Sequence, residues 1–314
     1  MEYVTLNNGV KMPMVGLGTF QIPLEKMNDV IGWAFSEGYR MFDTAWKYRN
    51  EAALADALKQ NGIKREEVFI STKCNVESFF VKGPRGGKRG WLDIRNLKSI
   101  KKVVLESFKN LNTDYLDLFL VHWPWPIPLA QDIYSELVRL QKDGRIRAVG
   151  VCSALPPHLD AFVDAAEVVP AVNQFEISPL NTQKKLIKYC HERGICVEAM
   201  STFSHFRSTE TRKDIIGNEA IAPISKKYGK SIPQVILRWL IQQGIVIIPK
   251  SSNKDRLKEN ISIFDFELTA DEMTIIDGLD QGQFLNYKPD KTLTKPYWIR
   301  GRVPSKYRNW KGFE

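Results

Sequence analysis

The sequence has few cysteines and no long apolar run, and these absences exclude several classes of protein. Its four cysteines are too few for a disulfide framework in a chain of 314 residues, and they lack the spacing of metal ligands. They are Cys74, Cys152, Cys190 and Cys196. No apolar stretch reaches the roughly 18 residues of a membrane helix, and the first residues do not begin a signal-peptide pattern. We therefore expect a cytoplasmic protein with reduced thiols, without a metal and without a membrane partner.

Glycine-rich nucleotide motifs and hydrolase motifs are absent as well. Gly16-Leu17-Gly18 does not continue into the dinucleotide fingerprint of a doubly wound sheet. The glycines from Gly83 to Gly87 have the wrong spacing for a phosphate loop, and Arg89 stands where that motif needs Ser or Thr. No nucleophile elbow occurs, so a serine hydrolase is not expected. Nothing beyond scattered basic residues favours a nucleic-acid partner.

The composition that is present is typical of a globular protein with a large core, because 43% of the residues are hydrophobic and 26% are charged. The net charge of +9 is concentrated in residues 281–314, which carry eight basic and only two acidic side chains. The basic residues there are Lys288, Lys291, Lys295, Arg300, Arg302, Lys306, Arg308 and Lys311. Such a tail favours an anionic substrate or partner, but a solvated, charged segment explains it equally well.

Strand and helix patterns alternate along most of the chain after an N-terminal hairpin. Asn7-Asn8-Gly9 is a hairpin turn between two short apolar segments. The predicted strands cover residues 15–20, 40–45, 68–74, 116–122, 146–151, 171–177, 197–201 and 245–248. The predicted helices cover residues 24–36, 51–60, 97–111, 133–141, 158–166, 184–192, 219–228, 231–243, 256–263 and 269–279. Capping boxes begin the helices at Ser231 and Thr269.

Eight alternating strand–helix units over roughly 250 residues predict an α/β fold, a (β/α)8 TIM barrel with an N-terminal β-hairpin. A doubly wound sheet is the structural alternative. We expect the barrel domain to cover residues 1–280 and to carry an insertion after strand 3, at residues 75–96. The extended C-terminal tail, residues 281–314, is basic and aromatic, and we expect it to pack at or near the barrel mouth.

Four polar side chains stand at or just beyond the C-terminal ends of three predicted strands, where barrels keep their active sites. Asp43 ends the second strand, Tyr48 follows it, Lys73 ends the third and His122 ends the fourth. A lysine cation near a tyrosine favours the phenolate and lowers the phenol pKa. A carboxylate can hold that lysine, and a histidine can hydrogen-bond the reacting oxygen. This set is suited to protonating an oxygen while a carbonyl group is reduced.

At these motifs the sequence closely resembles the aldo-keto reductases, from about Tyr3 to Leu279. The motifs are Asp43-Thr44-Ala45 with Tyr48 and Asn50-Glu51, then Ser71-Thr72-Lys73, then His122-Trp123-Pro124. The resemblance places the family's four catalytic residues at Asp43, Tyr48, Lys73 and His122, and it implies that Tyr48 is the proton donor, that Lys73 tunes it and that His122 orients the carbonyl. It also implies an NADP-dependent oxidoreductase that reduces an aldehyde or ketone to an alcohol by hydride transfer from NADPH.

The cofactor side shows a partial match. Lys250, Ser251 and Arg256 supply cations and a hydroxyl near the start of a helix, which suits a phosphate. The resemblance assigns them to the 2′-phosphate of NADP(H). It places further cofactor contacts at Thr19, Asp43, Gln174, Ser201, Glu259 and Asn260, with Gln174 on the nicotinamide carboxamide and Glu259 and Asn260 on the adenine.

Three departures from the family pattern surround the expected nicotinamide site. Cys152-Ser153 stands where the family usually has Ser-Asn, and Met200 replaces an aromatic residue that stacks on the ring. Arg49 replaces a usual glycine beside Tyr48 and adds a cation at the mouth. A working reductase with an altered cofactor pocket is the favoured interpretation. A barrel that binds nucleotide or another ligand without efficient reduction is an alternative, as is different chemistry on the same four residues.

The substrate pocket is expected to be aromatic. Phe20, Trp46 and Trp123 belong near the predicted mouth, and packing in the core explains such residues equally well. They suit an apolar, sugar-like or aromatic carbonyl compound. Arg49 and the basic tail favour an anionic small-molecule substrate. We expect a monomer or a weak homo-oligomer.

Overall fold

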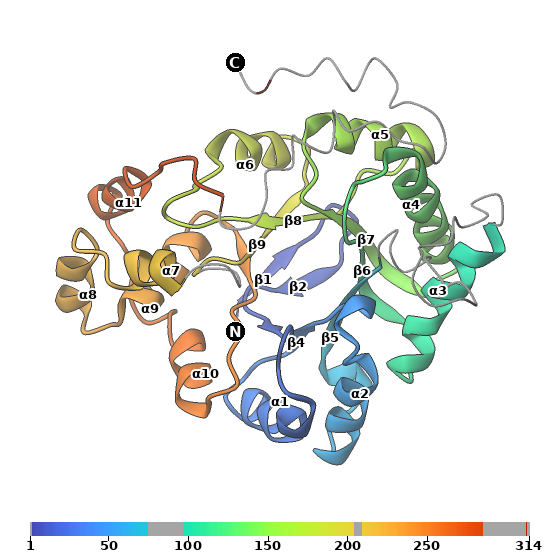
Figure 1. Ribbon diagram of the computed structural model, residues 1–314, viewed down its shortest axis with the longest axis horizontal. Helices are drawn as coiled ribbons and strands as arrows, with labels where there is room; N and C mark the ends of the chain where they lie inside the picture. Colours follow the sequence, from blue (N-terminus) through green and yellow to red (C-terminus); the bar gives the residue numbers. More distant parts are fainter. Residues whose placement is uncertain (1, 75–96, 204–208, 285–311, 313–314) are drawn as a thin grey trace, which may run out of the picture.

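The computed structural model describes residues 2–74, 97–203, 209–284 and 312, and its centre is a parallel sheet of eight strands (Figure 1). The strands are β3 (Leu17–Gly18), β4 (Met41–Asp43), β5 (Phe69–Cys74), β6 (Leu116–Val121), β7 (Ile146–Cys152), β8 (Val172–Glu176), β9 (Cys196–Met200) and β10 (Val246–Ile247). Each strand pairs with its neighbours in the sequence, in parallel. A parallel bridge between Val15 and Ile247 joins the two edge strands. The predicted (β/α)8 barrel is therefore confirmed, and the doubly wound alternative is excluded.

Helices surround the barrel, as the alternating pattern predicts (Figure 1). They are α1 (Met27–Ser36), α2 (Glu51–Gln60), α3 (Leu97–Asn110), α4 (Ile127–Lys142), α5 (Pro156–Ala166), α6 (Lys184–His191), α7 (Thr209–Ile216), α8 (Ala222–Tyr228), α9 (Ile232–Ile241), α10 (Lys254–Ile261) and α11 (Ala270–Asp277). Short 3-10 turns cover Leu24–Lys26, Trp46–Tyr48 and Arg65–Glu67. Both predicted capping boxes are present, at Ser231 and Thr269.

Two helix predictions were wrong. Helix α4 begins at Ile127, not at residue 133, because a proline in the first helical turn needs no backbone donor and has a suitable φ. Helix α7 was not predicted at all. Its sequence is mostly polar, and among its residues whose side chains are described only Ile215 is fully buried, so no apolar period reveals it.

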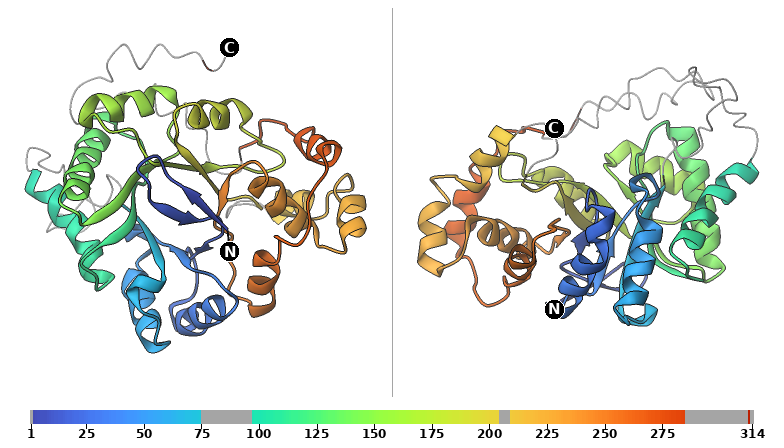
Figure 2. Two further views of the ribbon diagram at one scale, coloured as in Figure 1. Left: turned by 180° about the vertical axis from the view of Figure 1, so that it is seen from behind. Right: turned by 60° about the horizontal axis from the view of Figure 1, so that its bottom comes forward.

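The N-terminal hairpin covers one end of the barrel, as the view from behind shows (Figure 2, left). Strands β1 (Tyr3–Thr5) and β2 (Lys11–Pro13) pair in antiparallel fashion. Leu6 and Met12 are buried in the same apolar cluster as residues of the barrel strands. The turn is held by Asn8 Nδ2, which donates to Arg147 O at 2.9 Å. The hairpin thus closes the end of the barrel opposite the strand C-termini, and the other end is left for the site.

A large apolar core fills the space between the strands and the surrounding helices, and a smaller one lies inside the barrel. Strands β5 and β6 are buried at every residue, as a sheet covered on both faces requires. In the described ranges no helix is both long and apolar enough to cross a membrane. The predicted insertion at 75–96 and all of the tail beyond residue 284 except Gly312 lie outside the described residues. The first tail residues do contact the barrel, because the backbone N–H groups of Gln281 and Gln283 donate to Leu180 O.

Candidate active site

The four predicted side chains meet at one end of the barrel. Asp43 is the last residue of β4, Lys73 lies in β5, and His122 directly follows β6. Lys73 Nζ donates to Asp43 Oδ1 at 2.5 Å and to Thr44 O at 3.0 Å. The same nitrogen lies 5.4 Å from the centre of the Tyr48 ring, and the Tyr48 and His122 rings are 5.7 Å apart. The carboxylate, the ammonium, the phenol and the imidazole therefore form one cluster.

Lys73 is the electrostatic centre of this cluster, since its side chain is fully buried. Burial lowers the Lys73 pKa, but the charges of Asp43 and Tyr48 outweigh it, and the net shift is upward. Lys73 is thus a permanent cation that a single carboxylate neutralises. A buried charge needs such a partner, because an unpaired ion loses its hydration without compensation.

Tyr48 is a neutral phenol in this environment. Burial raises its pKa to about 12, the charge of Lys73 opposes the rise, and Asp43 reinforces it. Lys73 acts in the direction that the sequence predicted, but the expectation of a lowered pKa was wrong, because desolvation of the phenolate is the larger effect. Tyr48 therefore holds its proton at physiological pH and has a cation in place to stabilise the phenolate once the proton leaves.

His122 is a neutral imidazole. Its pKa is well below the ordinary value because burial, Lys73 and Lys47 all oppose the cation. Its Nδ1 makes no hydrogen bond to any residue in the described part of the chain. The ring stacks on Trp123 with the centroids 5.6 Å apart. A neutral imidazole can donate one N–H to a substrate oxygen without competing with Tyr48 as the acid.

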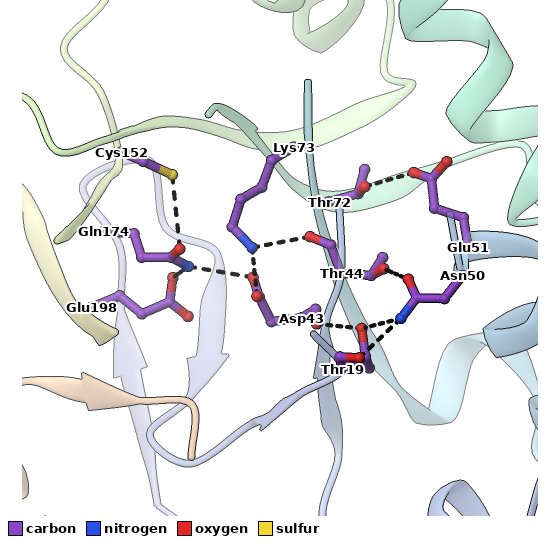
Figure 3. A network of polar contacts seen from close by, with 10 residues as sticks. All are labelled: Thr19, Asp43, Thr44, Asn50, Glu51, Thr72, Lys73, Cys152, Gln174 and Glu198. Carbon is purple, nitrogen blue, oxygen red and sulfur yellow. Dashed lines mark hydrogen bonds and ion pairs between the residues drawn. The ribbon is translucent and has the colours of Figure 1, made fainter. Parts of the chain in front are cut away.

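A polar network continues from this cluster across the barrel interior (Figure 3). Gln174 on β8 donates from Nε2 to Asp43 Oδ2 at 3.3 Å and to Glu198 Oε2 at 2.6 Å. Cys152 Sγ donates to Gln174 Oε1 at 3.8 Å. Glu198, on β9, was missed by the sequence analysis, although a glutamate in an otherwise apolar strand was the available signal. The predicted cofactor ligand Cys152 is 1% exposed, so its thiol serves this network and not the surface of the site.

On the other side of Asp43, hydrogen bonds hold the β4 loop in place (Figure 3). Thr19 Oγ1 donates to Asp43 O at 2.9 Å, and Asn50 Nδ2 donates to Thr19 O at 2.9 Å. Thr44 Oγ1 donates to Asn50 Oδ1 at 2.7 Å. Thr19 was expected to contact a cofactor, and the structure places it fully buried beneath the loop. Its hydroxyl supports Asp43 and Asn50.

The predicted mouth residues surround the cluster. Phe20 packs against Tyr48 with ring centroids 4.6 Å apart. The guanidinium of Arg49 lies 3.8 Å from the centre of the Trp46 ring, and Trp46 Nε1 donates to Glu106 Oε2 at 3.0 Å. Arg49 has φ +59°, in the left-handed region that favours glycine. A glycine would adopt this conformation without strain. The arginine instead adds an exposed cation next to Tyr48.

The predicted nicotinamide residues lie at the ends of β7 and β9. Ser153 and Ser201 both have left-handed backbones, with φ +51° and +58°. Ser153 N donates to Gln174 O at 2.8 Å, and Asn173 bonds both the N–H and the C=O of Ala154. These bonds give the turn after β7 a defined shape. Met200 is half-buried at the end of β9, so its thioether borders the same region.

The predicted phosphate residues collect around the start of α10. Asn253 caps the helix by accepting from Arg256 N at 3.0 Å, and Ser251 Oγ accepts from Asn253 N at 3.1 Å. Lys250 and Arg256 are exposed. Burial lowers the Lys250 pKa, and so does the charge of Arg212 on α7, a nearby cation that the sequence analysis missed. Cations and a hydroxyl at a helix N-terminus are a donor set that fits a phosphate.

The predicted adenine residues lie further along α10. Glu259 is half-buried and accepts a hydrogen bond from the Ser231 hydroxyl. Asn260 is buried. Glu259 therefore lies against the start of α9, and its contacts with Ser231 and Gln234 tie the two helices together.

The open end of the barrel thus holds a phenol, a buried lysine–carboxylate pair and a neutral histidine, and this set can deliver a proton to an oxygen. Comparison with known proteins agrees. A model of the Aldo/keto reductase family matches residues 14–281. The match covers most of the chain, and the chain belongs to the aldo-keto reductase family.

Individual relatives support the assignment. The chain is 37% identical over 293 residues to glyoxal reductase from Bacillus subtilis (strain 168), covering 93% of this chain and 98% of the relative. It is 36% identical over 292 residues to methylglyoxal reductase DkgA from Escherichia coli (strain K12), covering 92% and 97%. Among solved structures, an aldo-keto reductase from a Medee basin deep-sea metagenome library has a TM-score of 0.81 and 33% identity, covering 91% of this chain and 98% of that chain.

The family membership makes the chain an NADP(H)-dependent oxidoreductase of carbonyl compounds. A solved relative, the aldo-keto reductase from Bombyx mori in complex with NADP, has a TM-score of 0.77 and 28% identity, covering 92% of this chain and 96% of that chain. The residues present fit this cofactor at both ends. The cations near α10 suit its phosphates. Gln174 Oε1 accepts one thiol hydrogen bond within the described residues and retains a lone pair for a carboxamide N–H.

Proposed function

We propose that Tyr48 donates the proton when this enzyme reduces an aldehyde or ketone to an alcohol. Bound NADPH supplies the hydride. Tyr48 transfers its phenolic proton to the carbonyl oxygen, and Lys73 stabilises the phenolate that remains. Asp43 keeps Lys73 charged and in place, and His122 donates a hydrogen bond that orients the carbonyl. Solvent then returns a proton to Tyr48.

One observation carries this proposal: the buried ion pair of Lys73 and Asp43 lies beside the Tyr48 ring. An ion pair in the barrel interior is expensive to desolvate, so its place beside the only phenol of the cluster supports a role in proton transfer. Despite the cation, Tyr48 keeps its proton at neutral pH, because burial raises the phenol pKa to about 12. The effect of the cation is on the phenolate that forms during the reaction.

Replacing Tyr48 by phenylalanine tests the assignment. Tyr48→Phe keeps the ring that packs on Phe20 but removes the acid. General acid catalysis contributes about 10²- to 10⁴-fold, so we expect reduction of methylglyoxal with NADPH to fall by at least that range. Binding of NADPH, measured by quenching of tryptophan fluorescence, should stay within about twofold of wild type. Unchanged turnover would contradict the assignment of Tyr48 as the proton donor.

We further propose that the substrate is a small carbonyl compound, either a neutral 2-oxoaldehyde or an aldehyde that carries an anionic group. The names of two relatives, glyoxal reductase and methylglyoxal reductase, support this class. Two cations at the mouth support an anionic group on the substrate, since Arg49 and Lys47 are both exposed next to Tyr48. Comparing kcat/KM for methylglyoxal, benzaldehyde and a carboxylate-bearing aldehyde measures this preference directly.

The second candidate is a barrel that binds the nucleotide but reduces carbonyl groups inefficiently. The half-buried thioether of Met200 and the small Ser153 at the nicotinamide end favour this candidate, because a loosely held ring is poorly aligned for transfer. A titration with NADPH and with NADH separates the two. NADPH-selective binding with turnover supports the reductase, and binding without turnover on any carbonyl compound supports the second candidate.

We also propose a cellular location, an oligomeric state and domain limits for this enzyme. Four buried cysteines without a disulfide support a reducing, cytoplasmic location. We propose a monomer or weak homo-oligomer in which residues 1–280 form the barrel domain and residues 281–314 lie at or near its mouth. The hydrogen bonds from Gln281 and Gln283 to Leu180 support the start of that path.

A further inference from the structure

Glu198 is a fully buried carboxyl group that the proposed reaction does not use. It lies on β9, and its only described side-chain partner is Gln174 Nε2, at 2.6 Å. Its second oxygen, Oε1, has no hydrogen-bond partner in the described part of the chain. A buried carboxyl group with an unsatisfied oxygen is costly, so a purely structural role is a poor explanation for it.

Three hydrogen bonds connect Glu198 to Lys73 (Figure 3), and Lys73 in turn lies beside Tyr48. The amide nitrogen of Gln174 is shared between Glu198 Oε2 and Asp43 Oδ2. Asp43 Oδ1 accepts from Lys73 Nζ, and Lys73 lies beside Tyr48. The Gln174 amide has a defined orientation here, because Cys152 Sγ donates to its Oε1 and the ionised Asp43 can only accept from its Nε2.

We propose that Glu198 is a positioning residue for carbonyl reduction, acting on Tyr48 through Gln174, Asp43 and Lys73. This rests on the proposed function of Tyr48. Glu198 orients the Gln174 amide, and its charge state decides whether one or two carboxylates face Lys73. With Glu198 neutral, Asp43 alone balances the lysine. With Glu198 ionised, the extra negative charge strengthens the hold of Lys73 on its proton and weakens Tyr48 as an acid.

The charged and titratable groups that face Glu198 agree with such a switch. They are Asp43 on β4, Lys73 on β5, Cys152 on β7 and Cys196 on β9. Burial and then Asp43 raise the Glu198 pKa, and Gln174 and Lys73 oppose the rise, which leaves it at about 8. The ionisation of Glu198 therefore falls at mildly alkaline pH. Reduction should slow as the pH rises through that range.

The first test compares the pH dependence of reduction in wild type, Glu198→Gln and Glu176→Gln, with methylglyoxal and NADPH. The glutamine keeps the shape and can still accept from Gln174, but it does not ionise. We expect the alkaline fall in kcat to move up by about one pH unit or more in Glu198→Gln. Glu176→Gln is the matched control, a buried glutamate at the end of β8, and it should leave that fall in place.

The second test does not depend on turnover. Carboxyl ¹³C NMR of glutamate-labelled protein gives the Glu198 titration as the signal that Glu198→Gln removes. We expect its midpoint well above the ordinary glutamate pKa, about 4.3, and a lower midpoint in Asp43→Asn, because the neighbouring anion is gone. An unmoved kcat profile in Glu198→Gln overturns the proposal, as does an ordinary midpoint or one that Asp43→Asn leaves unchanged.

The two tests separate this proposal from the proposed function. A wild-type protein that reduces no carbonyl compound contradicts the function of Tyr48, whatever Glu198 does. A wild-type protein that is active and loses activity in Tyr48→Phe, but whose pH profile is the same with Gln at position 198, contradicts the role of Glu198 alone.

Discussion

Lys73 shows how one residue sets the chemistry of the site. Its ammonium is fully buried, and it donates to one carboxylate and one backbone carbonyl. A charge in that position is stable only because Asp43 faces it, and it is useful only because Tyr48 is adjacent. Burial lowers the His122 pKa most, and the same cation lowers it further. Lys73 thus acts on both Tyr48 and His122, the side chains that we propose as the acid and the orienting donor.

Met200 borders the region where we expect the nicotinamide ring, at a position where the sequence analysis expected an aromatic residue in the family. A methionine can lie on a ring, but it is flexible and offers less flat contact area than an aromatic side chain. We expect Met200→Tyr to tighten NADPH binding about twofold to tenfold, since an aromatic pair contributes about 0.5–1.5 kcal/mol. Fluorescence titration of wild type and Met200→Tyr with NADPH measures the two dissociation constants. Equal dissociation constants would show that the half-buried pocket already compensates.

Helix α10 is the element that brings the predicted phosphate-binding groups together. Its N-cap, Asn253, fixes the first turn, and the capped amide belongs to Arg256 itself. The capped first turn thus fixes the position of the Arg256 backbone. Anions are stabilised at such an end both by free N–H groups and by the helix dipole. A cation on the first turn adds selectivity for an extra phosphate.

Arg256→Ala should therefore weaken NADPH far more than NADH. A charge-assisted hydrogen bond contributes about 1.5–3 kcal/mol, so we expect the NADPH dissociation constant to rise roughly tenfold to a hundredfold. Lys258→Ala is the matched control, an exposed cation two residues further along the same helix. Titration of wild type and both variants with NADPH and with NADH gives the dissociation constants to compare. Equal losses for NADPH and NADH would mean that Arg256 does not read the 2′-phosphate.

At the scale of the whole molecule, a buried ionisable group links folding to pH. Glu198 has a folded-state pKa of about 8, above its unfolded value. The native state therefore binds the proton more tightly than the unfolded state does. The contribution of Glu198 to the free energy of unfolding is greatest below the unfolded-state pKa. It is lost as the pH rises through the folded-state pKa.

Thermal unfolding of the apo protein tests this linkage. We expect the wild-type Tm to fall between about pH 5 and pH 8, and the fall to be smaller in Glu198→Gln, which has no proton to lose. Glu272→Gln provides a contrast, because hydrogen bonds to Lys227 and Tyr228 hold the Glu272 pKa at about 2 despite its burial. That variant should change the acid side of the curve and leave the alkaline side alone. Parallel Tm curves for wild type and Glu198→Gln would contradict the linkage.

The barrel and most of the candidate site were predictable from the sequence. Apolar strands such as β6 alternate with amphipathic helices, and this local pattern survives in any tertiary context. Asp43, Tyr48, Lys73 and His122 could be placed together because strand C-termini meet at one end of a barrel. Helix α7 and Arg212 were missed because a polar helix has no apolar period to detect.

What the sequence by itself determined was the closed sheet, the hairpin at one end and the set of groups at the other, since these depend on the order and period of the residues. Only the tertiary structure decided how those groups behave. The pKa of Tyr48 rises because desolvation exceeds the effect of Lys73, and Glu198 reaches Asp43 through Gln174 although β9 and β4 lie far apart in the chain. Desolvation and contacts across the barrel are set by all neighbours at once, and no local pattern records them.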